Sequence, residues 1–286
     1  MIRTICWAVL SVLLAVPTFG VDLEISSRLD TLYWSPTRTD TTSGHQFTGS
    51  DLFYNVEGSV TQEIGDGLLF RGGVAIDPVL RSRAYAQLDF TVDNLNLAFT
   101  PFLGTFNSTQ KWFDPGLEAM VEYSWPGFLF VKGGFLTTFA PVAKSGDYYL
   151  SSLTAAVGGV LENGIVTFTI QDKSATFRTS ESLTTVDSST KYWLDTEMFL
   201  KNFPLRWAIL TGYQVTGRSY IGSAETLTSI HSALLGLRFS WDVGAGTTLY
   251  LQGESAIFTV GWNETDLEVP SNRGLYQAVA GVRYHW

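Results

Sequence analysis

The sequence predicts an all-β protein, a transmembrane antiparallel up-and-down β-barrel of about 14 strands. Three observations support this prediction. Apolar and polar side chains alternate over long stretches, aromatic residues make up 14% of the chain, and charged residues make up only 16%. Alternation with a period of two is typical of strands with one apolar face. The charged fraction lies well below the roughly 25% of a typical soluble domain.

The first 20 residues have the pattern of a cleavable export signal. A basic residue, Arg3, precedes an apolar run over 5–16, and Thr18 and Gly20 occupy the −3 and −1 positions before Val21. The apolar run is too short to span a bilayer, which takes about 20 residues. We therefore expect 1–20 to be a signal peptide, removed on export, and 21–286 to be a single barrel domain.

The alternation is clearest in four stretches, namely 52–64, 84–93, 117–125 and 191–200. Each has one mainly apolar face and one face that carries the charged side chains. Their lengths match or exceed the roughly 9–11 residues of a tilted membrane strand. After residue 20 the sequence has no uninterrupted apolar run of ten residues. Since only helices and closed barrels satisfy their backbone groups inside lipid, the barrel is the membrane architecture that this pattern allows.

Turn residues divide the chain with a regular rhythm. Short connections rich in Gly, Asn, Asp and Pro, which favour tight hairpins, are predicted at 65–67, 93–94, 126–127, 162–164, 202–204 and 242–246. Longer polar connections are predicted at 36–51, 78–83, 104–116, 139–150, 173–189, 217–228 and 260–273. The Ser/Thr-rich stretch 173–189 is expected to be a mobile loop. Thirteen connections join 14 strands, although the weak signal per strand leaves counts from 12 to 16 open.

The chain ends on YQAVAGVRYHW, in which every second residue back from Trp286 is apolar. This ending resembles the C-terminal signal by which outer-membrane barrels are recognised for assembly, with Tyr276, Val282, Tyr284 and Trp286 as its apolar and aromatic positions. The stretch 21–286 resembles bacterial outer-membrane β-barrels, and in strand number the monomeric fourteen-stranded OmpG-like porins. The resemblance implies a monomer in the bacterial outer membrane that contacts its lipids and the barrel assembly machinery. A soluble secreted β-sandwich is the competing architecture.

The strand number determines the expected width of the barrel. Fourteen strands tilted by about 40° give a backbone radius of roughly 14 Å, and side chains of about 6 Å leave a hole of roughly 8 Å radius. More acidic than basic residues lie on the polar face, which predicts a mild preference for cations; solvated wall residues without selectivity are the alternative. The predicted pore-lining residues are Glu57, Arg71, Asp89, Glu118, Glu122, Lys132, Asp195, Glu197, Arg206, Arg238, Glu254 and Arg283.

These features predict a porin-like channel for passive diffusion of small hydrophilic solutes or ions. One alternative is a surface adhesin or structural barrel that acts through its extracellular loops. Another is a transporter of hydrophobic solutes, with lateral openings at kinks near Gly72, Gly133 or Gly158. An apolar interior site for such solutes would use Phe53, Leu69, Trp193, Phe199, Leu210 and Leu234.

An enzyme is not expected. His45, His231 and His285 are far apart in the predicted barrel, and the only cysteine, Cys6, lies in the signal peptide. We therefore expect no catalytic residues, metal or cofactor. Without Arg3, 17 basic side chains face 27 acidic ones, and this acidic balance argues against nucleic acid as a partner.

Overall fold

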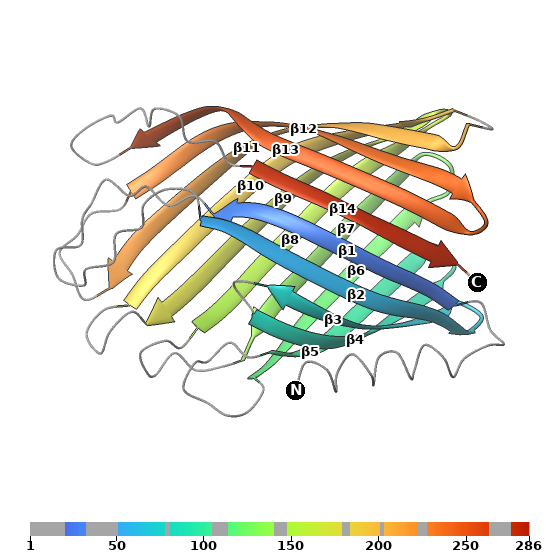
Figure 1. The fold of residues 1–286 in the computed structure, drawn as a ribbon, viewed down its shortest axis with the longest axis horizontal. Helices are drawn as coiled ribbons and strands as arrows, with labels where there is room; N and C mark the ends of the chain where they lie inside the picture. Colours follow the sequence, from blue (N-terminus) through green and yellow to red (C-terminus); the bar gives the residue numbers. More distant parts are fainter. Residues whose placement is uncertain are drawn as a thin grey trace.

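The computed structural model describes residues 21–32, 51–77, 81–104, 114–139, 148–178, 184–200, 203–221, 228–262 and 276–285. These residues form fourteen antiparallel strands that close into a barrel (Figure 1). Each strand pairs with its neighbours in sequence, and β1 pairs with β14. The predicted all-β up-and-down architecture and the predicted strand number are confirmed. No helix in the described part of the chain is long and apolar enough to cross a membrane.

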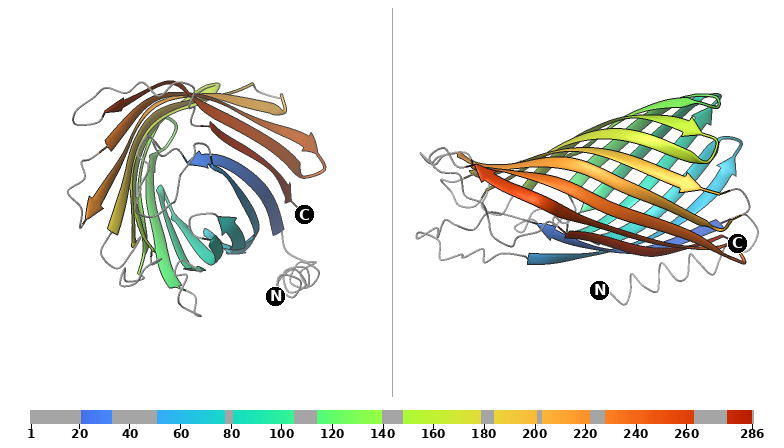
Figure 2. Two further views of the ribbon diagram at one scale, coloured as in Figure 1. Left: turned by 60° about the vertical axis from the view of Figure 1, so that its left-hand side comes forward. Right: turned by 90° about the horizontal axis from the view of Figure 1, so that it is seen from above.

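The strands differ in length around the barrel. Strands β9 to β13 have 15 to 17 residues each, whereas β3, β5, β7 and β14 have 10. Figure 1 and Figure 2 show the longer strands reaching further at the end of the barrel away from the short turns. The bounds of the fourteen strands are Val21–Leu32 (β1), Asp51–Gly65 (β2), Leu68–Asp77 (β3), Arg81–Val92 (β4), Leu95–Gly104 (β5), Asp114–Trp125 (β6), Leu129–Thr138 (β7), Tyr148–Leu161 (β8), Gly164–Arg178 (β9), Thr184–Phe199 (β10), Leu205–Ile221 (β11), Thr228–Gly244 (β12), Thr247–Trp262 (β13) and Tyr276–His285 (β14).

The outer surface of the barrel is apolar. Large apolar side chains are exposed on many strands, among them Phe99 at 46%, Leu153 at 64% and Leu251 at 55%. Few apolar side chains are buried by comparison. A single closed sheet with its apolar face outward excludes the β-sandwich, in which two sheets would press their apolar faces together. Such a surface suits lipid rather than water.

The short connections have the turn geometry that their sequences predict. Gly67, Gly127, Gly244 and Gly246 have φ between 73° and 87°, and Asp93 has φ 51°. Asp93 is a residue type that tolerates this left-handed region better than most. The predicted turns at 65–67, 93–94, 126–127, 162–164 and 242–246 therefore lie where expected, while part of 202–204 falls outside the described residues.

The predicted long connection 173–189 is wrong in its extent. Strand β9 continues to Arg178 and β10 begins at Thr184, so most of this stretch is paired strand. The prediction failed because hydrophobic alternation marks only the part of a strand that has one apolar face. Where both faces are polar the ladder continues without an alternating signal. Other strands also extend into predicted connections: β11 runs to Ile221, β13 runs to Trp262, and β4, β6 and β8 begin at Arg81, Asp114 and Tyr148.

Backbone pairing continues through the glycines where kinks were expected. Gly72, Gly133 and Gly158 each have partners on both neighbouring strands without a register shift. The β4–β5 ladder is instead interrupted between the pairs Tyr85↔Phe102 and Leu88↔Phe99. Pro101 lies in this gap, and proline has no backbone N–H to donate to a ladder.

Candidate functional site

The inward face of the barrel is identified by ion pairs that join strands that are not neighbours. Arg71 on β3 binds Glu24 on β1 at 2.8 Å, and Arg238 on β12 binds Asp195 on β10 at 2.8 Å. Such side chains pass over an intervening strand, which is possible where they converge on the concave side of a curved sheet. Residues paired directly across a ladder point to the same face. This rule assigns the inward face strand by strand, and it places all twelve predicted lining residues there.

A first cluster of inward side chains crosses the seam where the barrel closes; its members are Glu24, Arg71, Tyr250 and Arg283. The Glu24 carboxylate accepts hydrogen bonds from Arg71 Nη2 at 2.8 Å, Tyr250 Oη at 2.8 Å and Arg283 Nη2 at 3.1 Å. This seam cluster joins β1, β3, β13 and β14. Hydrogen bonds to charged groups are the stronger ones in proteins, so the cluster reinforces the β1–β14 closure.

A second cluster, the far-wall cluster, lies on β10, β12 and β13. Arg238 bridges Asp195 and Glu197 through its two terminal nitrogens, each at 2.8 Å. Lys191 Nζ lies 2.5 Å from Glu254 Oε1 and 5.2 Å from the centre of the Trp193 ring. In consequence the basic groups of this wall are held beside carboxylates.

Three of the predicted lining carboxylates have no basic group within ion-pair distance among the described residues. Glu57 accepts a hydrogen bond from the Tyr85 hydroxyl, and Asp89 accepts from Gln87 Nε2 at 2.8 and 3.0 Å. Glu118 on β6 is the third. Lys132, by contrast, lies 3.5 Å from Glu122, and Arg206 lies 4.0 Å from Glu197. Among the predicted lining residues, the carboxylates without an ion pair therefore lie on β2, β4 and β6.

Aromatic rings on the inward face lie over glycines of the adjacent strand. The four directly opposed pairs are Gly73 with Tyr85, Gly116 with Phe102, Gly158 with Phe130 and Gly281 with Tyr250. A Cβ added to any of these glycines would come within 2.1–2.4 Å of the ring. The absence of a side chain thus lets the rings lie along the wall, an arrangement known as aromatic rescue of strand glycine. Sequence reasoning missed these pairs because the register was unknown.

An apolar cluster also lies on the inward face. Phe102 and Leu150 are almost fully buried and pack with Tyr85, Leu136 and Ala175. The Arg83 guanidinium lies 5.4 Å from the Tyr85 ring centre and 5.6 Å from that of Phe102. Sequence reasoning missed this interior apolar cluster, since its residues come from five strands.

The apolar residues that were expected inside and whose side chains are described do lie on the inward face, apart from the cluster around Phe102. Leu210 and Leu234 are buried on the inward face of β11 and β12. Leu69, Trp193 and Phe199 also share the inward face by register, and the side chain of Phe53 lies outside the described residues.

The histidines are not brought together. His231 lies on the outward face beside Tyr213, and His285 contacts Asp22 at the other end of the barrel. His45 lies outside the described residues. Within the described ranges no group of three or more His, Cys, Asp or Glu side chains could hold a metal ion.

The last strand presents its apolar positions outward. Val282 and Tyr284 face away from the interior, opposite Leu249 and Thr247 of β13. The side chains of Tyr276 and Trp286 lie outside the described residues.

Comparison with known proteins gives no family by sequence: no family model matches the chain, and no curated protein matches it. Solved structures do match. A bacterial polysaccharide outer membrane secretin is 9% identical, with coverage of 93% of this chain and 98% of the other, at a TM-score of 0.53. An outer membrane channel from Pseudomonas putida F1 is 11% identical, with coverage of 95% and 97%, at a TM-score of 0.51. OmpT, an outer membrane protein of Vibrio cholerae, is 9% identical, with coverage of 95% and 99%, at a TM-score of 0.47. The chain has the architecture of the outer-membrane β-barrel proteins.

Proposed function

We propose that the protein is a porin-like channel through which small hydrophilic solutes and ions diffuse passively. The observation that carries this proposal is the inward face itself. It is polar and charged, and its longest side chains bind carboxylates along the wall in the seam and far-wall clusters. With the roughly 14 Å backbone radius expected for fourteen strands, wall-bound side chains leave room for water.

The outer membrane is the proposed location. The apolar outer surface and the short turns at one end agree with the arrangement of bacterial outer-membrane barrels. Export through the signal peptide 1–20 belongs to the same proposal, as does recognition of β14 by the assembly machinery through its outward apolar positions. We propose a monomer without enzymatic activity or cofactor.

Electrophysiology tests the channel directly. The purified protein, folded in detergent and added to a planar lipid bilayer, is expected to give discrete conductance steps. A protein that inserts, as judged by protease protection of its strands in liposomes, and yet gives no steps would refute the proposal.

The proposed mild cation preference rests on the three carboxylates without a basic partner, Glu57, Asp89 and Glu118. Carboxylates that line a pore favour cations, whereas paired ones are neutralised locally. In asymmetric potassium chloride, the triple variant E57Q/D89N/E118Q is expected to shift the reversal potential toward that of a non-selective pore. The matched control is Asp172→Asn, which removes a carboxylate from the outward face. Equal shifts in the two proteins would show that the three carboxylates do not set selectivity.

A second candidate function is transport of hydrophobic solutes, favoured by the buried interior contact of Phe102 and Leu150. Liposome swelling separates the two. A channel for hydrophilic solutes admits small sugars at rates that fall with solute size, and the variant Leu150→Ser leaves them unchanged. A transporter of hydrophobic solutes excludes sugars but retains a hydrophobic fluorophore, and the same variant weakens that retention.

A further inference from the structure

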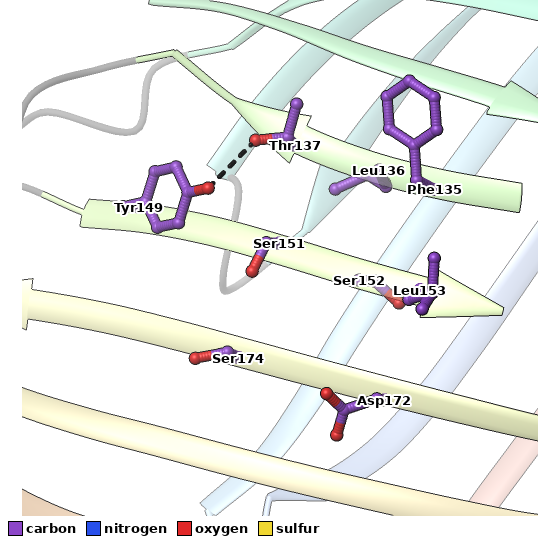
Figure 3. A pocket seen from close by; sticks show the side chains of 9 residues that line it. All are labelled: Phe135, Leu136, Thr137, Tyr149, Ser151, Ser152, Leu153, Asp172 and Ser174. Carbon is purple, nitrogen blue, oxygen red and sulfur yellow. Dashed lines mark hydrogen bonds between the residues drawn. The ribbon is translucent and has the colours of Figure 1, made fainter.

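A shallow groove of about 210 Å³ lies on the outward surface across β7, β8 and β9. Figure 3 shows Phe135, Thr137, Tyr149 and Leu153 on the near side of these strands, with Leu136 behind them. The register agrees, since the lining residues Thr137, Ser151 and Ser174 lie directly opposite one another on the face away from the interior. Seven of the nine lining residues face outward, and Leu136 and Ser152 belong to the inward face of the same strands. The groove therefore opens mainly away from the inward face that was proposed to conduct.

The groove changes from apolar to polar along β7 and β8, whereas its β9 side is polar throughout. One row of opposed residues contains the exposed Phe135 and Leu153 together with Asp172. The next row, further from the short turns, contains Thr137, Ser151 and Ser174. Such a gradient matches an amphipathic molecule that lies parallel to the strands.

The height of this change fits a membrane boundary. Leu153 lies eight residues from Leu161, where β8 ends at its short turn. At about 3.4 Å per residue and a tilt of about 40°, the separation along the barrel axis is roughly 20 Å. The apolar band of such barrels is about 25 Å tall. The polar row therefore lies at headgroup level on the side of the long connections.

The polar end offers hydrogen-bonding groups suited to hydroxyls. Thr137 Oγ1 lies 3.2 Å from Tyr149 Oη and 3.2 Å from the Thr138 carbonyl oxygen, and its single proton can be donated to only one of them. The two hydroxyls together provide both donor and acceptor groups at the polar end. Asp172, on the β9 side of the first row, accepts from Thr190 Oγ1 at 2.8 Å through Oδ1, and its second carboxylate oxygen remains to accept. The Ser151 and Ser174 hydroxyls make no side-chain hydrogen bond within the described residues. Sugar hydroxyls both donate and accept, as this set requires.

A phosphate headgroup suits the groove less well. Its lining contains no lysine or arginine, and its one charge is the exposed carboxylate of Asp172. An anion would be repelled there without compensation. The volume is also below the roughly 300–1,000 Å³ of pockets that enclose a drug-sized molecule. The groove therefore has room for the ring of a headgroup, and an acyl chain would lie beside it.

We propose that this groove binds the sugar headgroup of a glycolipid in the outer leaflet, with an acyl chain against Phe135 and Leu153. The proposal rests on the proposed membrane location, and it does not require that the barrel conduct. The site is lipid-facing and adds a binding function to the outer surface.

Native mass spectrometry tests the groove with detergents of equal chain length. The protein is held in a dodecyl amine-oxide detergent, and n-dodecyl-maltoside is titrated in. The wild type is expected to retain one saturable maltoside adduct. The variant Ser151→Phe, which fills the groove, is expected to bind it roughly tenfold more weakly. Ser27→Phe, on the outward face of β1, is the matched control and should bind as the wild type does.

The other outcomes are equally decisive. Equal adduct retention by both phenylalanine variants and the wild type would overturn the proposal, and so would equal binding of free maltose, because then the chain would contribute nothing. If Ser151→Phe does not fold, Asp172→Ala removes the carboxylate acceptor with little change in volume, and the same loss is expected. Conductance of the same samples separates the two proposals. If the protein gives conductance steps but the groove variant keeps the maltoside adduct, only the groove proposal is refuted. If the groove variant loses the adduct but the protein gives no conductance steps, only the channel proposal is refuted.

Discussion

At the scale of single residues, inward glycines determine where aromatic rings lie. The ring of Tyr85 covers Gly73, and its hydroxyl reaches Glu57; the ring of Tyr250 covers Gly281, and its hydroxyl reaches Glu24. In both pairs the glycine lets the ring lie against the wall and brings a phenol to a carboxylate. The glycines therefore act on the position of charged groups in the interior, although they have no side chain of their own.

Substituting Gly73 by alanine tests this relation. The added Cβ would come within 2.4 Å of the Tyr85 ring, so the ring is expected to tilt inward. We expect a loss of about 1–3 kcal/mol in the free energy of unfolding and a lower single-channel conductance. On the adjacent strand Gly58 has open space around its Cβ position, so Gly58→Ala is the control and should be neutral or slightly stabilising. A Gly73→Ala barrel as stable and as conductive as Gly58→Ala would contradict the assignment.

Ala245 shows strain at a single residue. It has φ 51° in the turn between β12 and β13, between two glycines that also have positive φ. A backbone in this region costs an L-residue about 1–2 kcal/mol, and glycine avoids that cost. Part of the gain is offset because glycine gives the unfolded chain more conformational entropy. Ala245→Gly is expected to raise the free energy of unfolding by roughly 0.5–1 kcal/mol, measured by urea titration in lipid vesicles. A decrease would mean that the turn already accommodates alanine without strain.

At the scale of elements, Pro101 creates a weak place in one ladder. The β4–β5 pairing lacks two successive pairs beside this residue, while the β5–β6 pairing is continuous through it. The proline nitrogen faces β4, where a donor is missing. In a closed barrel this interruption is the equivalent of a short unpaired edge.

Replacing Pro101 by valine is expected to restore the donor and stabilise the barrel by about 1 kcal/mol, the net value of one hydrogen bond. The midpoint of heat-induced unfolding in detergent, followed by the gel shift between folded and unfolded barrel, measures the change. Pro126→Val is the control, because Pro126 lies in the turn that follows the last β6–β7 pair, Trp125↔Leu129. Equal midpoints for the two variants would show that the gap has another cause.

At the scale of the whole molecule, closure depends on the contact of the first and last strands. Nine residue pairs join β1 to β14, from Asp22↔His285 to Asp30↔Gln277, and the seam cluster binds across them. Glu24 is the common acceptor of that cluster, with its side chain only 18% exposed. Its loss would leave Arg71 and Arg283 without the carboxylate that they share.

Glu24→Ala is therefore expected to lower the free energy of unfolding by roughly 1–3 kcal/mol. Glu122→Ala, the control, breaks a 3.5 Å pair within the β6–β7 hairpin and is expected to cost at most about 1 kcal/mol. Urea titration of both variants in the same vesicles provides the comparison. A Glu24→Ala loss no larger than the control would show that backbone pairing alone closes the seam.

The sequence alone determined the architecture, because a barrel with an apolar outer surface repeats one simple constraint along its whole length. An apolar residue must face outward at every second position, so stretches such as 117–125 reveal the strand and both of its faces. Glycine and aspartate at turns such as 65–67 locate the hairpins, because they adopt a backbone conformation that most residues avoid. The strand number, the short turns and the inward assignment of the charged residues follow from local rules.

Only the tertiary structure decided how the strands pair and therefore which side chains meet. The partners of Glu24 lie 47, 226 and 259 residues away, and the aromatic–glycine pairs depend on the exact ladder register. The polar ends of β9 and β10 were also invisible to the pattern, since these segments have no apolar face to reveal them. Alternation reports which face a residue occupies, but closure and register set its neighbours.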